Sequence, residues 1–373
     1  MKHFYGIDGL RAYLAWTVVL WHIFLFTTVE DRIPILQKAS KIADIAVLVF
    51  VIISGFVITH LLVEKKEKYI PYITRRFLRI YPVYIICLIA GVFSTYLNFQ
   101  TFLSPPPWGH WIPQAGLLIA EHDGLKLLGY SPYLLTHLML LHGAIPNNIL
   151  NMSEYMFVAP AWSLSLEWQF YLIAPMIIFL TRTHTKRILL ASMSIAGYFA
   201  YTHGWFGGFS LPSFLPGAAP YFAMGVVTRL VIQKIPRITI FPTAVFIICV
   251  VFLMMAHALV PFFIWSVFIT CMLLNEPTDN ISKRIKLFYN YIFNSTPIKF
   301  LGERSYSTYL AHVPIIQLTC YVSIKIFALS VWPTFAIVAI TTPLLTFLSS
   351  IILYKFVEAP AIACGKRLFN EPT

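Results

Sequence analysis

The chain has 373 residues, of which 58% are hydrophobic, 16% aromatic and only 11% charged. Soluble domains carry roughly 25% charged residues, so this chain lacks the polar side chains that would cover a water-soluble body. The composition also excludes a disordered chain, a collagen-like repeat, a coiled coil and a small disulfide scaffold. We therefore expect an all-α integral membrane protein that crosses the bilayer several times.

Apolar runs predict about ten transmembrane helices, because a bilayer core about 30 Å thick needs about 20 apolar helical residues. The runs lie near residues 12–29, 42–62, 80–97, 162–181, 187–203, 215–233, 239–256, 258–275, 299–325 and 332–356. The expected fold is a polytopic helical bundle formed by one domain over residues 1–373. The five cysteines form no Cys-x-x-Cys pair, so we expect neither a disulfide framework nor a metal site.

The basic residues predict the orientation of the chain. A net charge of +12 would suit nucleic acid only if the cations gathered on one polar face, and here they sit in short clusters between apolar runs. Lys and Arg concentrate in the cytoplasmic loops of membrane proteins. With both termini cytoplasmic, the runs place all but five of the 27 Lys and Arg residues inside. The exceptions are Arg32, Lys38, Lys41, Lys126 and Lys325.

One outward-facing connection, from about residue 98 to residue 160, is far longer than the others. Long irregular loops in compact proteins are usually functional or disordered. Its aromatic and proline residues include Pro105, Pro106, Pro107, Trp108, Trp111, Tyr130 and Tyr133. We predict an ordered lid over the outer mouth, the alternative being that the aromatic side chains anchor at the lipid interface. His137 and His142 are five residues apart and would not share a helix face, so a metal pair is not expected.

Ionisable side chains within apolar runs are costly and indicate a functional site. In the first run, Arg11 and His22 are eleven residues apart, which is about 20° from three full turns, so both project from one helix face with His22 about 16 Å deeper. Asp8 lies one turn before Arg11 and is placed to orient it. The first run therefore predicts a membrane-embedded histidine above an arginine at the inner edge.

The fourth run opens with Trp162, Ser163 and, four residues later, Glu167. Because it enters from outside, Glu167 lies about 8–10 Å below the outer boundary. That depth is comparable to the depth of His22 reached from the inner side. We therefore predict that Glu167 and His22 form a pair, although a lone membrane histidine is more often a satisfied structural residue.

Two further runs carry polar residues. Ser305 and His312 share a helix face in the ninth run, as do Tyr309 and His312. This stripe is either catalytic or a set of interhelical hydrogen bonds that only hold helices together. Ser54 and Gly55 in the second run indicate a close-packing site more than a catalytic one.

Three arginines stand at the cytoplasmic start of the third run. Arg75 and Arg79 are one turn apart and Arg76 flanks them, so their guanidinium groups are able to converge on phosphate oxygens. The alternative is an anchor on anionic lipid. The absence of lysine among them favours phosphate recognition.

Together these motifs resemble the acyltransferase 3 family of integral-membrane acyltransferases, which modify bacterial surface polysaccharides, lipopolysaccharide O-antigen, nodulation factors and some macrolides. The matching segments are residues 7–11 with His22, residues 50–56, Arg76 to Arg79, residues 162–167, residues 302–307 with Tyr309 and His312, and residues 357–360. They span nearly the whole chain in the expected order. Ala12 stands where the family often has glycine, and no fused SGNH hydrolase-like domain is expected.

The resemblance implies a multi-pass enzyme of the cell inner membrane that moves an acyl group, most simply acetyl, from cytoplasmic acyl-CoA to a hydroxyl of a carbohydrate or lipid-linked glycan. The CoA phosphates would bind Arg75, Arg76 and Arg79, with Arg11 further in. His22 would act as general base with Glu167 as its orienting partner, or would carry the acyl group covalently. Asp8, Ser54, Trp162, Ser163, Ser305, Tyr309 and His312 would support the site.

Two other functions compete with this interpretation. A proton-coupled transporter would use His22 and Glu167 as a relay, but such proteins show paired broken helices in two similar halves, and we detect none in the sequence. A subunit that only anchors glycan-assembly enzymes would have no use for a histidine and a glutamate inside the bilayer.

Overall fold

The computed structural model describes residue 4 and residues 6–39, 41–65, 67–103, 115–234, 259–274 and 280–369. This part of the chain is helical and contains no strand. It divides into two compact units. Unit 1 comprises Met1–Val18, Lys41–Lys66 and Pro220–Tyr306, and unit 2 comprises Val19–Ser40, Glu67–Ala219 and Ser307–Thr373. Helices α1, α9 and α14 each continue from one unit into the other.

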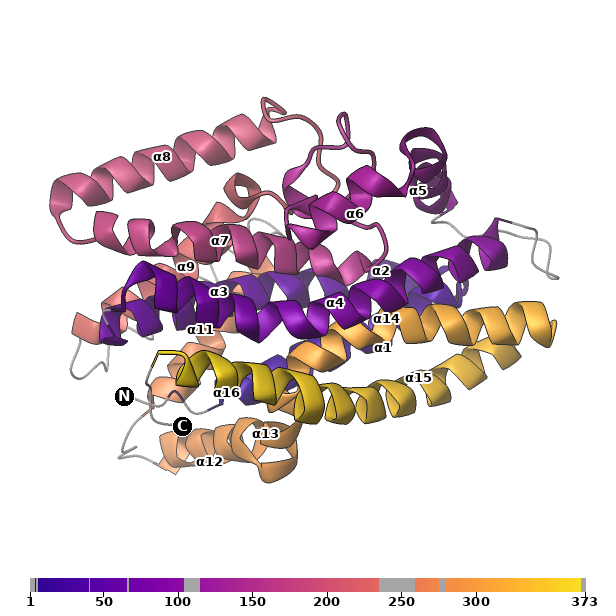
Figure 1. Cartoon of the computed structure of the whole chain (residues 1–373). Coiled ribbons are helices and arrows are strands. Elements are labelled where there is room, and N and C mark those ends of the chain that lie inside the picture. Colours follow the sequence, from indigo (N-terminus) through magenta and orange to yellow (C-terminus); the bar gives the residue numbers. More distant parts are fainter. Residues whose placement is uncertain are drawn as a thin grey trace. The chain divides into compact units, whose positions relative to one another are not determined.

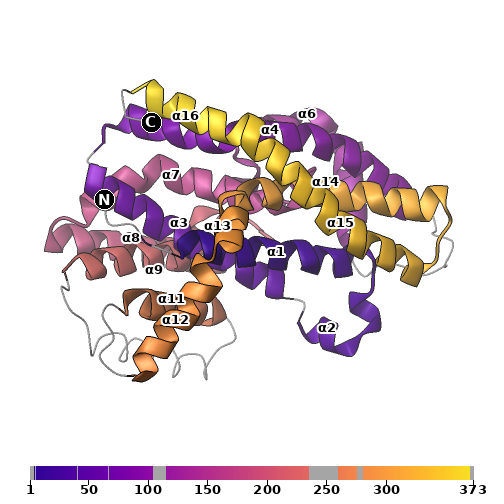
Figure 2. The same cartoon turned by 90° about the horizontal axis from the view of Figure 1, so that it is seen from below.

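Unit 1 is built on the contact between α3 (Ile42–Lys65) and α11 (Val260–Leu273), with α12 (Asn280–Asn294) joined to both α11 and α13 (Thr296–Glu303). It also holds the first part of α1 (Ile7–Phe26) and most of α9 (Leu215–Lys234). The second view shows α12 next to α11 and continuing toward α13 (Figure 2). Glycine allows α3 and α9 to approach closely, because a Cβ on Gly55 would lie only 2.6 Å from the main-chain oxygen of Phe222 in α9.

Unit 2 contains the longest helix, α4 (Tyr69–Phe102). The terminal helix α16 (Ala359–Arg367) packs along α4, and α15 (Val331–Leu353) leads into it through the short helix η6 (Tyr354–Glu358) (Figures 1 and 2). Figure 1 also shows α7 (Trp162–Leu180) and α8 (His184–Thr202) as an antiparallel hairpin. The side chain of Thr183 accepts a hydrogen bond from the amide of Lys186 and caps α8 at this reversal. Helix α14 (Ser305–Tyr321) supplies most of its length to this unit.

Among the residues that the structure describes, seven helices are long and apolar enough to cross a membrane. They are α1, α3, α4, α7, α9, α14 and α15. These confirm seven of the predicted runs and an all-helical, multi-pass membrane protein. The predicted run 187–203 forms helix α8 but is not among the seven, and the run 258–275 forms the shorter apolar helix α11. Residues 239–256 lie outside the described part, so the count of ten and the cytoplasmic termini stay predictions.

The predicted run 299–325 is interrupted, which corrects its start. Helix α13 ends at Glu303 and α14 begins at Ser305, with Arg304 as the cap between them. The Arg304 guanidinium turns back to donate to the carbonyl of Phe300 at 2.7 Å and lies over the Phe300 ring. A charged side chain that donates its hydrogen bond to the preceding turn marks a helix boundary that hydropathy alone does not detect.

The long connection is folded where it is described. Residues 115–160 form α5 (Ala115–Leu128), α6 (Tyr130–Leu138) and short 3₁₀ helices, whereas Pro105, Pro106, Pro107, Trp108 and Trp111 lie outside the described residues. Tyr133 is completely buried and donates to the carbonyl of Asn151 at 2.8 Å. The ring of Tyr130 stacks on Phe157. Tyr133 is therefore a core residue of this segment rather than a lipid anchor, and the role of the segment as a lid stays a prediction.

The contact between α3 and α9 yields the first test. A Cβ on Gly225 would collide with the backbone of Ile52 and Phe56, so Gly225→Ala should destabilise the protein by about 1–3 kcal/mol through overpacking. Thermal unfolding of the purified protein in detergent measures this as a lower apparent Tm. The control is Gly208→Ala, because nothing lies within 4 Å of a Cβ at that position. Equal Tm values for the two variants would contradict the proposed close contact.

Candidate functional site

His22 and His312 lie against each other within unit 2. The Nδ1 atom of His22 on α1 is 2.9 Å from the Nε2 atom of His312 on α14, and the ring centroids are 5.0 Å apart. His312 is completely buried, whereas His22 is only partly buried. The two imidazoles therefore form a hydrogen-bonded pair in which the more accessible ring is His22.

The surroundings of His312 decide which nitrogen carries each proton. Its Nδ1 atom is buried and makes no well-aligned hydrogen bond with the described residues, but the carbonyls of Thr308 and Tyr309 lie within electrostatic reach. Because these carbonyls favour an N–H, we assign the proton of His312 to Nδ1. Its Nε2 atom then accepts from the Nδ1–H of His22, which places the lone pair of His22 on Nε2.

Tyr309 joins α14 to the start of α7. Its hydroxyl donates to the carbonyl of Pro160 at 2.9 Å and lies 3.0 Å from the hydroxyl of Ser163. Trp162 and Ser163 are both buried at this point. Tyr309 and Ser163 thus form an interhelical hydrogen bond, which fits the alternative that polar residues of this stripe only hold helices together. His312, three residues further along the same helix, contacts His22 instead.

Glu358 is a site residue that our sequence-based candidates omitted. It is buried, and its Oε2 atom accepts a hydrogen bond of 2.7 Å from Ser307 on α14. The available signal was a carboxylate directly after the last apolar run, in a segment that matches the family pattern. Ser94 on α4 likewise donates to the amide oxygen of Gln317 at 2.6 Å. Helix α14 therefore sends polar side chains to four other parts of unit 2.

Glu167 accepts a hydrogen bond of 3.0 Å from Tyr171, one turn along α7. The predicted pairing of Glu167 with His22 stays a prediction, since the hydrogen bond described for His22 is made to His312. Depth in the membrane suggested the pairing, and depth says nothing about which side of the helix a residue faces.

The three arginines of α4 differ in their surroundings. Arg75 forms an ion pair with Glu67, which lies just before the helix. The Nε atom of Arg76 is buried and makes no hydrogen bond to the described residues, and the phenols of Tyr72 and Tyr171 lie within electrostatic reach of its charge. Arg79 is half-buried one turn further on. Arg75 also has a buried donor, Nη1, without a hydrogen-bond partner among the described residues, but Arg75 has an anionic neighbour in Glu67.

The remaining predicted residues belong to unit 1. Arg11 forms an ion pair of 3.9 Å with Asp8, as the one-turn spacing predicted. Gly302 packs against the backbone of Asp8, where a Cβ would collide. Ser54 is buried in α3 and its hydroxyl makes no hydrogen bond to the described residues. Ser305 is buried at the start of α14.

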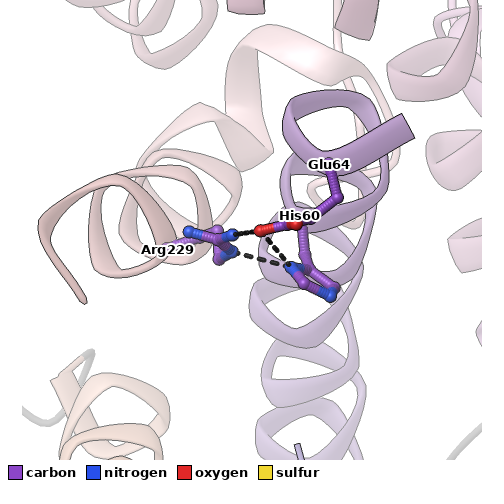
Figure 3. Close-up of polar contacts among 3 residues, drawn as sticks. All are labelled: His60, Glu64 and Arg229. Atoms are coloured by element: carbon purple, nitrogen blue, oxygen red, sulfur yellow. Dashed lines mark hydrogen bonds and ion pairs between the residues drawn. The ribbon is translucent and has the colours of Figure 1, made fainter. Parts of the chain in front are cut away.

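Unit 1 also holds a charged cluster that sequence reasoning missed (Figure 3). Arg229 on α9 donates to Oε1 of Glu64 at 2.7 Å and to Nδ1 of His60 at 2.9 Å, both on α3. Arg229 is only 3% exposed, so the carboxylate and the imidazole offset the cost of burying its charge. The signal was the spacing of four residues between His60 and Glu64, which places both on one face.

His137 and His142 meet although, as the spacing indicated, they do not share a helix face. Their rings stack with centroids 3.9 Å apart and an angle of 3°. They approach because α6 ends at Leu138 and the chain turns, so the two residues never share a helix. Tyr84 holds the Nδ1 atom of His137, and the Nε2–H of His142 donates to the carbonyl of Ala161 at 3.0 Å. Burial lowers the pKa of His142 to about 4.

Comparison with known proteins places this site in context. The chain matches the acyltransferase 3 family model, described as an acyltransferase domain, over residues 4–354. It is similar to the peptidoglycan O-acetyltransferase OatA of Listeria monocytogenes serovar 1/2a, at 23% identity over 387 residues. That match covers 96% of this chain and 56% of the relative, so the chain spans about half the length of the relative. No solved structure matches the chain.

The buried histidine pair predicts acid sensitivity. In the unfolded chain a histidine has a pKa of about 6.5, and in the fold the pKa of His142 is about 4. Between these values the unfolded chain binds a proton that the folded chain does not, so stability falls as the pH drops, by up to about 3 kcal/mol. We expect the apparent Tm of His142→Gln to fall less between pH 7 and pH 4.5 than that of the original protein.

The matched control is His203→Gln, because His203 is exposed at the end of α8. This variant should keep the full pH dependence. If His142→Gln and His203→Gln respond identically to acid, the buried pair is not the source of the sensitivity.

Proposed function

Because this chain belongs to the acyltransferase 3 family, whose model it matches over residues 4–354, we propose that it is a membrane O-acyltransferase. It would move an acyl group, most simply acetyl, from acyl-CoA on the cytoplasmic side to a hydroxyl of a cell-surface glycan or glycolipid. The observation that carries this proposal is the hydrogen-bonded pair of His22 and His312 on two helices long enough to cross the membrane. The similar OatA protein is a peptidoglycan O-acetyltransferase, which supports a carbohydrate acceptor.

In the proposed reaction, Nε2 of His22 takes the proton from the acceptor hydroxyl. The oxygen attacks the thioester carbonyl, a tetrahedral intermediate forms, and the C–S bond breaks to release the CoA thiolate. The proton on His22 then neutralises the thiolate. His312 is a positioning residue, since it fixes the His22 ring and accepts from Nδ1–H so that the lone pair stays on Nε2. A covalent acyl-histidine intermediate is the second route.

The donor would be held by its phosphates. We assign this role chiefly to Arg76 and Arg79. Arg76 has a buried N–H group without an acceptor among the described residues, no ion pair with a carboxylate is described for it, and an arginine fork fits phosphate oxygens. Arg75 would add less, because Glu67 already pairs with it. Arg11, with Asp8 beside it, keeps its predicted role in donor binding. Lipid anchoring of the arginines remains the competing hypothesis.

The transporter hypothesis is not favoured, because the family is one of acyltransferases. A relay would also require that both partners exchange protons with water on opposite sides of the membrane. His312 is completely buried, which suits an orienting partner better than a group that passes protons onward.

Replacing the histidines tests the mechanism. His22→Ala should lower the transfer rate by about 10²–10⁴-fold, the usual contribution of a general base. His312→Gln should lower kcat by about 10-fold, because one hydrogen bond of about 1.4 kcal/mol is lost, while the KM for acyl-CoA stays unchanged. Purified protein with acetyl-CoA and a soluble glycan acceptor, with free thiol as the readout, provides the measurement.

The control is His203→Gln, which should retain full activity because His203 lies on an exposed turn. Full activity of a folded His22→Ala variant would refute the role of the histidine. A His312→Gln variant that changes only the KM for acyl-CoA would instead place His312 in donor binding.

The arginines are tested by donor binding. Arg76→Gln and Arg79→Gln should each weaken acyl-CoA binding by about 10–100-fold, the value of a charged hydrogen bond. Arg75→Gln should have a smaller effect, because its charge is already offset by Glu67. Titration of each purified variant with CoA measures the dissociation constants. An unchanged affinity for CoA in both the Arg76 and the Arg79 variants would favour lipid anchoring as the role of these residues.

A further inference from the structure

Helix α12 carries an exposed apolar face, formed by Ile281, Leu287, Phe288 and Tyr291. These four side chains are between 66% and 78% exposed. At 100° per residue, Ile281, Phe288 and Tyr291 lie within about 80° of one another, so the face is continuous. On the helices that are long enough to cross a membrane, exposed apolar side chains are expected to face lipid. Helix α12 is not one of these helices, so its apolar face requires a separate explanation.

Helix α12 is too short and too polar to cross the bilayer. Its 15 residues extend about 22 Å, whereas the hydrocarbon core is about 30 Å thick. Its sequence includes Lys283, Arg284 and Lys286 and no acidic residue. A helix with one apolar face and several cations is typical of the membrane–water interface, where it lies in the plane of the membrane.

The other side of α12 packs against protein. Tyr289 is buried, and its ring centroid lies 5.7 Å from that of Phe268 on α11. The Nζ atom of Lys286 donates to the carbonyl of Met272 at 3.1 Å. Met272 is the last residue but one of α11, so this contact is made at the end of that helix. Figure 2 shows α12 beside α11.

Contacts with α1 place α12 at the same boundary. Tyr13 donates from its hydroxyl to the carbonyl of Ile292 at 3.1 Å, and a Cβ on Gly9 would collide with the main-chain oxygen of Phe293. Gly9 and Tyr13 flank Arg11 in the first two turns of α1, at the end that the charge distribution places inside. Helix α12 therefore lies across the start of α1 and the end of α11 rather than beside their middles.

The charges on α12 indicate which partner its apolar face binds. Lys283 and Arg284 are exposed, and Arg284 lies between Phe288 and Tyr291 around the helix. Long basic side chains keep their methylene groups on apolar surface and extend the charge into the polar layer. Anionic lipids of the cytoplasmic leaflet attract such cations. A second copy of the chain fits less well, because a two-fold contact through this face would bring the same cations of both copies together.

We propose that the apolar face of α12 binds the cytoplasmic leaflet of the membrane and that Lys283 and Arg284 contact the phosphates of anionic phospholipids. The apolar side chains would enter the boundary between headgroups and acyl chains by about 5–10 Å. This interaction would hold the start of α1 and the end of α11 at the membrane surface. It goes beyond the proposed transfer reaction and does not depend on it.

Spin labels test the position of this face in the full chain, reconstituted in lipid nanodiscs after its five native cysteines are replaced by alanine. Labels at Ile281→Cys and Phe288→Cys should be relaxed more strongly by oxygen, which partitions into lipid, than by water-soluble Ni-EDDA. The matched control is Asn290→Cys, because Asn290 is exposed and lies about 180° from Ile281 around the helix. Its label should respond more strongly to Ni-EDDA.

Lipid selectivity tests the charges. A fluorophore on Ile281→Cys is exposed to nitroxide-labelled phosphatidylglycerol or to nitroxide-labelled phosphatidylcholine in otherwise identical discs. The anionic lipid should quench more strongly, because each cation near the surface favours it by up to about 5-fold. Lys283→Gln and Arg284→Gln should each reduce this preference by up to about 5-fold. Lys126→Gln, which removes an exposed lysine from α5, should leave the preference unchanged.

Three results would overturn the proposal. Labels at Ile281→Cys and Phe288→Cys that respond chiefly to Ni-EDDA would place the face in water. Labels shielded from both reagents would show that another protein surface covers the face. Equal quenching by the two lipids would exclude anionic phospholipid as the partner. The acyl-transfer assay is independent of all three measurements, so a failure here leaves the proposed function intact.

Discussion

The organisation of unit 2 depends on the hydrogen bond between His22 and His312. This bond is made by helix α14, whose polar side chains find their partners on the neighbouring helices. Inside a bilayer, water does not satisfy side-chain donors and acceptors. Helix α14 presents His312, Tyr309, Ser307 and Gln317, and these meet α1, the start of α7, Glu358 and α4 respectively. Rotating α14 would break these contacts together, so the rotation that holds His312 against His22 is the rotation that satisfies the other three residues.

This constraint separates the structural and the reactive members of the polar stripe. Ser307 and Tyr309 are buried, and their hydroxyl groups donate hydrogen bonds to the carboxylate of Glu358 and the carbonyl of Pro160 respectively. His22 is only partly buried, and one of its two ring nitrogens is held by His312. A general base needs a fixed ring and a lone pair directed at its substrate. In the proposed reaction this role falls to His22, and the other residues of the stripe supply the rigidity that keeps its ring in place.

Much of this arrangement follows from the amino-acid sequence, and there are identifiable reasons why the sequence did not predict the other contacts. Hydropathy finds the helices because the bilayer demands about 20 apolar residues, and the helical period correctly pairs Asp8 with Arg11. Contacts between distant segments are different. Depth alone suggested the pairing of Glu167 with His22, which stays a prediction, and it gave no sign of the contact between His22 and His312. Helical spacing separated His137 from His142, although the helix ends between them. The ion pair of Arg75 with Glu67 was also not predicted, because nothing in the helix reveals that Glu67, outside it, folds back to Arg75.

The distribution of charge gives a reason for a neutral pair at the reacting position. The buried charge of Arg229 is compensated by Glu64 and His60. A permanently anionic partner beside His22 would favour the imidazolium form, which has no lone pair and accepts no proton. His312 is neutral when it accepts from Nδ1–H of His22, so it orients the ring without holding a proton on it. In the proposed reaction, an imidazolium would form in the low-dielectric interior only when the acceptor hydroxyl gives up its proton. The charge would then exist for the lifetime of the transfer step, and the site would not have to stabilise it at rest.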